Sequence, residues 1–372
     1  MQSPDSGSVA VLFGTRPEAV KLCPVILALR RAGLVVDAVT TGQHRELLAD
    51  VLPRFGIVPD GDLELMRPDQ SLDYLLGTGI ERIGRYLESA SPQAVVVQGD
   101  TTSTLAAAIS AFHHRIPVGH VEAGLRTYDM DFPFPEEMNR RATTVIARWH
   151  FAPTAVAAEN LAREGIVDRV YVTGNTVVDA LRMILETAPV IPADLQSFLD
   201  SGPYVLASAH RRESWGEPIG NVARALAAVV DATPGLRVVF VTHPNPLARG
   251  PVDAALAGHP RVRILDALPY PQFLKVLAGA LVAVSDSGGV QEEGPTLGVP
   301  VLVTRAITER PEGISAGAVM LVGTDFDRIV SNALTLVRDP AARAAMSNSA
   351  RGIYGDGHAS ERIVAVLAEA LR

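Results

Sequence analysis

Short runs of β-branched and other apolar residues alternate with longer, helix-like stretches along almost the whole chain. Nearly continuous apolar strands separated by helices are typical of parallel sheets that are covered on both faces. The pattern predicts strands over residues 9–13, 35–40, 94–98, 118–121, 170–172, 204–208, 237–242, 262–265, 281–285 and 300–304. These strands fall into two sets, so the sequence predicts an α/β protein with two Rossmann-like domains that face a cleft.

The boundary between the two sets is expected near Gly174. There, Gly174-Asn175-Thr176 could end one strand and cap the next helix. We therefore expect one domain over residues 1–174, a second over 175–355 and a terminal segment over 356–372. A chain of 372 residues also exceeds the usual size of a single core, which favours two domains.

Composition and charge narrow the class of protein. Hydrophobic residues make up 48% of the chain and charged residues 20%, as in folded globular enzymes. Lys and Arg number 33 against 41 Asp and Glu, which gives a net charge of −8. Because an acidic chain binds nucleic acid and anionic membranes poorly, we expect neither partner, and a bound phosphate would need local positive charge.

Cysteine use and the N-terminus bear on the compartment. The single cysteine, Cys23, excludes an intramolecular disulfide and lies in an apolar stretch, which predicts a buried thiol in a reducing compartment. Residues 1–8 lack the basic and apolar regions of a signal peptide. No apolar run approaches the roughly 18 residues of a membrane span. The expectation is a cytoplasmic protein.

Carboxylates follow the predicted strands. Asp100 comes after the apolar run 94–98, and Glu122 comes after 118–121. Glu136 opens a helix-like stretch a little further on. Ligands of parallel α/β sheets bind at the carboxyl ends of the strands, so several acids there suggest proton-transfer chemistry. The alternative is structural, because Asp100 could cap a helix and Glu136 could favour a helix dipole.

Two glycine turns are candidates for binding phosphate. Arg16 follows Gly14 and precedes Pro17, so it would lie at the positive end of a helix, although a glycine turn with a surface arginine is common. A stronger signal is Ser287-Gly288-Gly289, which follows a strand and opens a helix whose amides could hold a diphosphate. The alternative reading of that turn is a serine cap with a structural glycine pair.

Further polar residues could complete a nucleotide site around the Ser287-Gly288-Gly289 turn. Glu293 could bind ribose hydroxyls, as acids do in dinucleotide folds, and Arg310 adds a cation at the same sheet edge. His210 and Arg211 follow the strand 204–208, where they could serve proton transfer and an anion.

Taken in order, these motifs resemble the bacterial, non-hydrolysing UDP-N-acetylglucosamine 2-epimerase family. The resemblance runs from about residue 9 to the C-terminus. The matching segments are FGTRPE at 13–18, GQHRE at 42–46, GDTT at 99–102, HVEAGLRT at 120–127, PEEMNR at 135–140, TGNT at 173–176, HRRE at 210–213, DSGGVQEE at 286–293, TERPE at 308–312 and YGDG at 354–357.

The resemblance implies a GT-B architecture, with a last helix at about 358–371 that returns to the N-terminal domain. It implies reversible epimerisation of UDP-N-acetylglucosamine to UDP-N-acetylmannosamine at the sugar's C2. In this family UDP is eliminated across C1–C2, leaving a 2-acetamidoglucal, and then adds back. The resemblance further implies a homodimer, no metal and no cofactor.

Roles follow from the resemblance, residue by residue. The acid/base residues would be Asp100, Glu122, Glu136 and His210. The residues that bind the UDP-sugar would be Arg16, Lys21, Leu268, Phe273, Ser287, Gly288, Gly289, Glu293 and Arg310, with Leu268 and Phe273 at the uracil. Phe273 could instead be a core aromatic.

A second, regulatory site is present in many bacterial members and binds a further UDP-N-acetylglucosamine. Residues that match it are Gln43, His44, Glu136, Arg211 and His243. Glu46 and Asp69 depart from it, because regulated relatives tend to carry Gln and a basic residue there. Two acids would repel an anionic effector, so we expect weak or absent activation by substrate.

Other functions stay open at this point. A hydrolysing 2-epimerase, which releases N-acetylmannosamine and UDP, would use much the same residues, and a related UDP-sugar could be the substrate. A GT-B glycosyltransferase would share the nucleotide half without needing all the acids. A catalytically silent nucleotide-sugar sensor is disfavoured by them. Cell-surface polysaccharide and secondary-metabolite pathways are both compatible.

Overall fold

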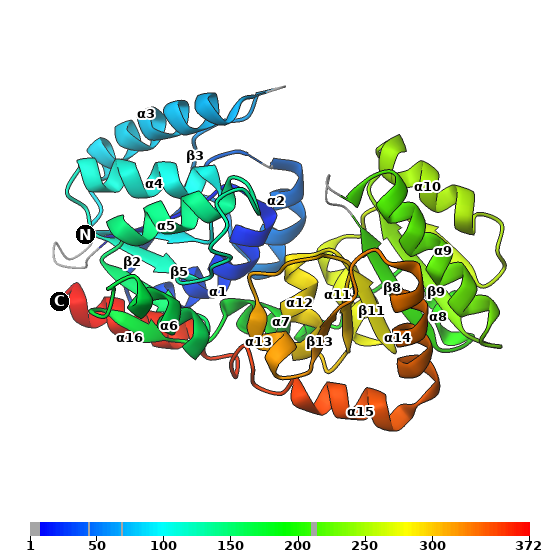
Figure 1. Cartoon of the computed structure of the whole chain (residues 1–372). Helices are drawn as coiled ribbons and strands as arrows, with labels where there is room; N and C mark the ends of the chain where they lie inside the picture. The colour runs from blue at the N-terminus through cyan, green and yellow to red at the C-terminus, as the bar shows by residue number, and fades with distance from the viewer. Residues whose placement is uncertain (1–7, 44, 68–69, 210–213) are drawn as a thin grey trace. The chain divides into compact units, whose positions relative to one another are not determined.

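Two compact units make up the chain in the computed structural model, which describes residues 8–43, 45–67, 70–209 and 214–372, with the side chains of 45–47 excepted. The N-terminal unit runs to Ile184 and also contains Tyr354–Arg372. The C-terminal unit is Leu185–Ile353. Each unit has its own parallel sheet with helices, so the predicted α/β class with two Rossmann-like units is confirmed (Figure 1).

The sheet of the N-terminal unit has seven parallel strands in the order β3-β2-β1-β4-β5-β6-β7. Their bounds are β1 Ser8–Phe13, β2 Val35–Thr40, β3 Gly61–Asp62, β4 Ala94–Gln98, β5 Val118–Val121, β6 Trp149–Ala152 and β7 Val170–Val172. The chain leaves β1 in one direction through β2 and β3 and returns on the other side at β4. The β1/β4 boundary is therefore a topological switch point, where ligands bind in such folds.

Helices cover both faces of this sheet, which is why β4 and β5 are buried along their whole length. The helices are α1 Arg16–Arg31, α2 Arg45–Val51, η1 Leu52–Phe55, α3 Leu72–Ala90, α4 Thr102–His113, α5 Glu136–Ile146, α6 Ala155–Arg163, α7 Thr176–Glu186 and α16 Ala359–Ala370. Helices α3 and α4 lie side by side (Figure 1).

The C-terminal segment is bound to the N-terminal unit by specific contacts. The Asn175 amide donates to the Tyr354 carbonyl at 2.7 Å. The Asp179 carboxylate accepts from the Ala359 and Ser360 amides at 3.2 and 2.9 Å, so α7 caps the start of α16. Helix α16, red in Figure 1, also packs on α1.

The sheet of the C-terminal unit has six parallel strands in the order β10-β9-β8-β11-β12-β13, with a switch point between β8 and β11. The strands are β8 Tyr204–Ala209, β9 Arg237–Thr242, β10 Val262–Leu265, β11 Val282–Ser285, β12 Val301–Val303 and β13 Val319–Leu321. The helices are α8 Ala193–Asp200, α9 Glu217–Asp231, α10 Pro246–Leu256, α11 Tyr270–Ala278, α12 Gly288–Thr296, α13 Pro311–Ser315, α14 Phe326–Arg338 and α15 Pro340–Ser349.

The predicted strands agree with the observed ones to within one residue at each end. Strands β3, β6 and β13 were not predicted. Strand β3 has only two residues, and β6 contains the polar His150 and begins directly after Arg148, so neither shows a continuous apolar run.

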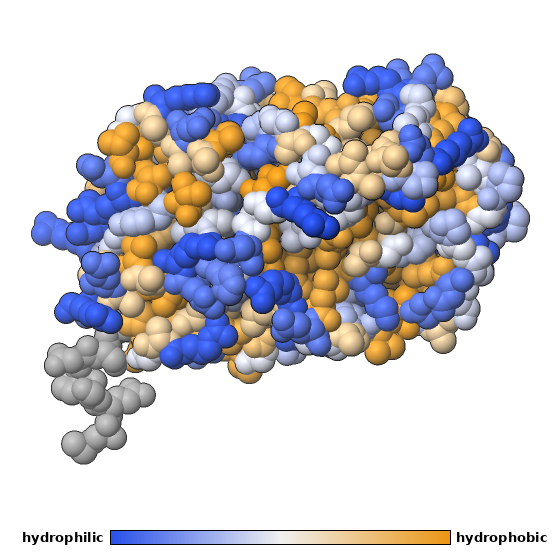
Figure 2. Space-filling model, turned by 90° about the horizontal axis from the view of Figure 1, so that it is seen from below, coloured by the Kyte–Doolittle hydropathy of each residue, from blue (hydrophilic) through white to orange (hydrophobic). Residues whose placement is uncertain are grey.

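Hydrophobic and hydrophilic residues are interspersed on the face of the molecule that Figure 2 shows. Among the described residues, no helix combines the length and apolar character that crossing a membrane requires. The single cysteine, Cys23, is buried in α1, and this burial raises the pKa of its thiol, which keeps it protonated.

Candidate active site

The carboxyl ends of β1, β4 and β5 meet at the switch point of the N-terminal sheet. Strand β4 pairs in parallel with β1 on one side and with β5 on the other. The segments that follow these three strands carry Arg16, Asp100 and Glu122. The structure thus brings three residues predicted from the sequence to neighbouring strand ends.

Glu122 is a buried carboxylate surrounded by hydrogen-bond donors. One oxygen accepts from the Lys21 ammonium and, at 3.2 Å, from the Asn175 amide. The other oxygen accepts from the Gln98 amide. Because Lys21 is itself buried, the ion pair is poorly screened by water. These contacts hold the carboxylate as an acceptor in one orientation, and they place Lys21, predicted to bind the UDP-sugar, directly on Glu122.

Glu18 joins the loop after β1 to the loop after β4. One carboxylate oxygen accepts from the Gly14 and Thr15 amides at 2.7 and 2.6 Å. The other accepts from the Thr101 and Thr104 hydroxyls at 2.5 and 2.8 Å. Sequence reasoning missed Glu18 as a site residue, although its T-x-x-E spacing is the signal of a capping box. The segments that carry Arg16 and Asp100 are therefore linked through one buried side chain.

Asp100 is partly exposed and is held by two residues of α5. Its carboxylate accepts from Arg140 Nη1 at 2.6 Å, and its main-chain carbonyl accepts from the Asn139 amide at 2.9 Å. Arg140 is among the largest fully buried side chains of the protein. Sequence reasoning did not single out Arg140, because nothing local shows that a residue 40 positions away contacts Asp100.

The two consecutive glutamates of α5 have different surroundings. Glu137 is fully buried, and its carboxylate accepts from Arg140, from the Thr127 amide at 3.0 Å and from the Tyr128 amide at 3.1 Å. Glu137 therefore holds the segment after β5 in place. Glu136, the predicted acid/base residue, is partly buried in the first turn of the same helix.

Two histidines lie side by side beneath this site, His120 on β5 and His150 on β6. Burial, with the nearby charges of His150, Arg126 and Arg140, lowers the pKa of His120 to about 3. Burial and Arg126 lower the pKa of His150 to about 4. Both rings are therefore neutral near pH 7.

The switch point of the C-terminal sheet lies at the start of α12. The Ser208 and Ser285 hydroxyls are 2.7 Å apart across β8 and β11, and Ser285 Oγ accepts from the Ser287 amide at 3.0 Å. Ser287 is the N-cap but its side chain makes no capping hydrogen bond. It is partly exposed, as are Gly288 and Gly289. Amides at such a helix start suit an anion.

Arg310 packs beside the first turn of α12. A Cβ atom on Gly288 would lie 3.0 Å from Arg310 Nη1. The guanidinium is paired with Glu292, Nε to Oε1 at 2.5 Å, and with Glu309. Glu309 also accepts from Arg305 at 3.1 Å. The structure brings Arg310 to Gly288 together with two carboxylates, Glu292 and Glu309, to which the sequence analysis gave no role.

The remaining residues predicted to bind UDP lie on α11 and α12 or just before them. The Tyr270 hydroxyl donates to Glu293 Oε1 at 2.8 Å and so orients this carboxylate. Leu268 and Phe273 are partly buried and pack against the core of the C-terminal unit.

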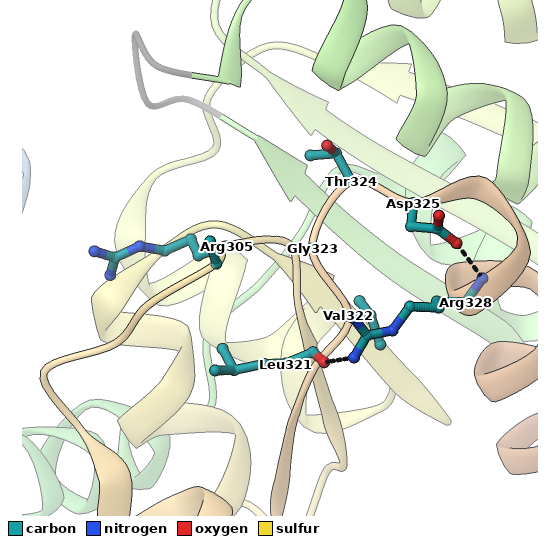
Figure 3. Close-up of a pocket in the computed structure, with 8 residues that line it drawn as sticks. Arg305, Leu321, Val322, Gly323, Thr324, Asp325 and Arg328 are labelled. Atoms are coloured by element: carbon teal, nitrogen blue, oxygen red, sulfur yellow. Dashed lines mark hydrogen bonds between the residues drawn. The ribbon is translucent and has the colours of Figure 1, made fainter.

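A cavity of about 640 Å³ lies at the ends of β12 and β13, on the β12 side of the β8/β11 switch point. It is lined by Arg305, Ala306, Leu321, Val322, Gly323, Thr324, Asp325 and Arg328. In Figure 3 the Arg305 guanidinium extends away from the loop 321–325, whereas Arg328 donates to the Leu321 carbonyl at 2.8 Å. The candidate acids and the glycine-rich helix start lie at the switch points and not in the lining of this cavity.

Several predicted residues lie outside the described part of the structure. These are His210, Arg211, His44, Asp69 and, for its side chain, Glu46. Of the other residues matched to a regulatory site, Gln43 accepts from the Ser103 hydroxyl at 2.7 Å. His243 packs on Trp215 with ring centroids 5.4 Å apart.

Within the described residues, no group of three or more His, Cys, Asp or Glu side chains is arranged to hold a metal ion. The groups placed at the two switch points are instead acids, amides and arginines.

Two parallel α/β units, one with carboxylates at its switch point and the other with a glycine-rich helix start, define a GT-B-like protein. A family model described as UDP-N-acetylglucosamine 2-epimerase matches residues 28–368. The chain belongs to this family, whose members are isomerases, and the resemblance read from the sequence is confirmed.

Known relatives align over nearly the full length of the chain. It is 43% identical to the UDP-N-acetylglucosamine 2-epimerases of Yersinia pestis and Escherichia coli K12, and each alignment covers 96% of this chain and 98% of the relative. The crystal structure of the Neisseria meningitidis enzyme bound to UDP-GlcNAc is similar, with a TM-score of 0.90 and 41% identity. That comparison covers 97% of this chain and all of the other.

Proposed function

We propose that the protein interconverts UDP-N-acetylglucosamine and UDP-N-acetylmannosamine without hydrolysis, by eliminating UDP and adding it back. The observation that carries the proposal is the pair of carboxylates Asp100 and Glu122 at neighbouring strand ends in a member of this family. The bound UDP-GlcNAc in the Neisseria meningitidis enzyme supports the choice of substrate.

The C2 proton of the sugar has no adjacent carbonyl, so simple deprotonation is unfavourable. Elimination across C1–C2 avoids a carbanion, because the C2 proton leaves to a base while the UDP oxygen leaves C1 with its bonding electrons. The 2-acetamidoglucal then accepts a proton at the opposite face of C2 as UDP returns to C1. Such a sequence needs acid/base groups at both faces, a role that we assign to the predicted set Asp100, Glu122, Glu136 and His210.

The surroundings of Glu122 suit an acid/base group that is held in one orientation. Its carboxylate is positioned by Lys21, Gln98 and Asn175, so little reorganisation is needed when a proton arrives or leaves. Asp100 is less buried, with 27% of its side chain exposed, and is the more accessible of the two.

We assign the binding of UDP mainly to the C-terminal unit. The α12 amides at Gly288 and Gly289, with Arg310, would hold the diphosphate, and Glu293, oriented by Tyr270, would hold the ribose. Leu268 and Phe273 would enclose the uracil. Arg16, which the resemblance also assigns to the diphosphate, lies in the segment after β1. A firm hold on free UDP between the two steps lets it return to C1.

Incubation with UDP-N-acetylglucosamine in heavy water, followed by NMR, tests the proposal. We expect intact UDP-N-acetylmannosamine with deuterium at C2. Free N-acetylmannosamine would identify the hydrolysing alternative, and the absence of exchange at C2 would point to a transferase or sensor. Asp100→Asn should lose the exchange while still binding UDP, whereas Asp194→Asn, on the exposed surface of α8, is the matched control.

We also propose that substrate activates the enzyme weakly or not at all, because Glu46 and Asp69 would repel an anionic effector. Turnover of UDP-N-acetylmannosamine should start without a lag and without added UDP-N-acetylglucosamine. A strict requirement for the added sugar would contradict this. A homodimer and a cytoplasmic location remain predictions, and sedimentation of the purified protein tests the first.

A further inference from the structure

The position of Asp100 is set by a short segment with an unusual backbone. Asp100 directly follows Gly99, which has a φ of +75° and whose amide donates to the Val121 carbonyl at 3.1 Å. This bond ties the turn after β4 to the end of β5. Because Asp100 follows Gly99 and Glu122 follows Val121, this one hydrogen bond joins the residues that directly precede the two candidate acids.

Two groups hold the main chain on either side of the Asp100 Cα atom. His120 Nε2 lies 2.8 Å from the Gly99 carbonyl oxygen, which belongs to the peptide that ends at the Asp100 nitrogen. The Asn139 amide donates to the Asp100 carbonyl at 2.9 Å. Both peptides that flank Asp100 are therefore fixed, one from β5 and one from α5.

A third group holds the carboxylate itself. Arg140 Nη1 donates to Asp100 Oδ2 at 2.6 Å. The same guanidinium is anchored by Glu137 Oε2, which accepts from Nε at 3.2 Å and from Nη2 at 2.9 Å. The planar fork of arginine suits this double contact, and a lysine could not reproduce it.

His120 and Arg140 are poorly suited to carry the proton themselves. A carbonyl oxygen only accepts hydrogen bonds, so His120 Nε2 must be the protonated nitrogen of a neutral ring. Its Nδ1 has no hydrogen-bond partner among the described residues, and burial lowers the pKa of the ring to about 3. The guanidinium of Arg140 stays protonated throughout the usable pH range. Both are built to orient a neighbour rather than to exchange protons.

We propose that His120, Asn139 and Arg140 are positioning residues that hold Asp100 at three points for proton transfer at C2. This inference rests on the proposed role of Asp100 and extends it to residues that do not touch the sugar. General acids and bases must lie within hydrogen-bond reach of the proton they move. A displacement of about 1 Å costs on the order of a hundredfold in rate, so the three contacts that fix Asp100 can control a large effect.

The first experiment measures the C2 exchange of Arg140→Lys and Asn139→Ala, with Arg163→Lys on the exposed surface of α6 as the control. We expect kcat to fall about 10- to 100-fold for the first two, with KM and the affinity for UDP within about twofold of the parent. The control should match the parent. Asn139→Ala keeps the buried ion pair, so it carries the test if Arg140→Lys folds poorly.

The second experiment compares His120→Gln with His120→Leu. The amide nitrogen of Gln can occupy the place of His Nε2 and still donate to Gly99, whereas Leu cannot. We expect His120→Gln to keep kcat within about threefold and His120→Leu to lose about 10-fold or more. Equal losses in both variants, or losses explained by a lower folded fraction, would overturn the role of His120.

The outcomes separate this inference from the proposed function. If the unaltered protein shows no exchange at C2, the proposed function fails. If it exchanges normally but Arg140→Lys and Asn139→Ala keep its kcat, only the positioning role fails. A parallel fall in kcat and in the affinity for UDP would also overturn it, because it would indicate general loss of structure.

Discussion

Two helix starts, those of α1 and α12, lie at the two switch points but have different chemistry, α1 following the first strand of its sheet and α12 the fourth strand of its own. At α1, the Glu18 carboxylate accepts from the Gly14 and Thr15 amides just before the helix, and so places a negative charge at its positive end. At α12, Ser287 makes no side-chain cap and Gly288 is partly exposed. One helix start (closed) thus already carries a carboxylate and the other (open) carries none in its first turn, so we infer that a diphosphate uses the amides of the second.

The charged groups near these helices are arranged in opposite ways. In the N-terminal unit, donors surround a carboxylate, as Lys21 and Gln98 do at Glu122. In the C-terminal unit, two carboxylates surround a cation, Arg310. The first arrangement orients an acid, and the second orients a guanidinium beside the open helix start. We infer that the chemistry is divided between the units accordingly.

The largest effect should come from Glu122→Gln. This change keeps the shape of the side chain but removes the group proposed to exchange a proton and the negative charge that pairs with Lys21. We expect kcat for C2 exchange to fall about 10²- to 10⁴-fold. The affinity for UDP, measured by calorimetry, should change little, because the C-terminal unit holds the nucleotide. Equal losses of kcat and UDP affinity would contradict the division between units.

The next largest effect should come from acidification, which should destabilise the N-terminal unit more than the C-terminal unit. The folded pKa values of His120 and His150 are lowered from 6.5 to about 3 and about 4, so the unfolded chain binds their protons first as the pH falls. Above about pH 6.5 both histidines are neutral in the folded and in the unfolded chain, and their contribution to stability is at its maximum. It is lost at about 1.4 kcal/mol per histidine and pH unit as the pH falls toward 4.

Hydrogen exchange at pH 7 and pH 5 measures this difference. Amides of β5 and β6 should lose protection, while those of β8 and β9 should lose less. In the C-terminal unit, the described histidines are His243, which is exposed, and His259, which is partly exposed. Equal loss in both sheets would contradict the assignment to the histidine pair.

The open start of α12 predicts a smaller effect on nucleotide binding. In Gly288→Ala the new Cβ would lie 3.0 Å from Arg310 Nη1, and Arg310 cannot move freely because Glu292 and Glu309 hold it. We expect the Kd of UDP to rise about 10-fold, the equivalent of about 1.4 kcal/mol.

The neighbouring glycine is the matched control. In Gly289→Ala the nearest atom, Glu293 Oε1, would be 3.4 Å away, an ordinary contact, so the Kd should rise less. If Gly289→Ala weakens binding more than Gly288→Ala, the diphosphate does not lie where we propose.

Local signals predicted much of this architecture. Apolar runs located most strands, and acids after them located Asp100 and Glu122, because both features are read from consecutive residues. What the sequence did not show are contacts between distant segments. Lys21 and Glu122 are 101 positions apart, and only the folded chain joins them.

The sequence also did not show which of two adjacent residues in one helix turn is buried. Glu136 and Glu137 are adjacent, acidic and both in the first turn of α5, yet Glu137 is fully buried. Which of them faces inward depends on how α5 packs on α4, and a local sequence pattern does not show this packing.

The smallest predicted effect concerns the closed start of α1. Glu18→Gln keeps an oxygen for the Gly14 and Thr15 amides but places an NH₂ group against Thr101 and Thr104, whose hydroxyls must then accept. We expect the free energy of unfolding to fall by about 1 kcal/mol, measured by urea denaturation.

Asp325→Asn, at the exposed N-cap of α14, is the control for loss of a carboxylate at a helix start and should cost a few tenths of a kcal/mol. UDP affinity should stay unchanged in both variants. Tighter binding of UDP or phosphate by Glu18→Gln would mean that Glu18 masks a second anion site, so that the two helix starts differ only in occupancy. Unchanged binding with reduced stability would mean that they differ in kind, since the start of α1 would then serve the fold and not the ligand.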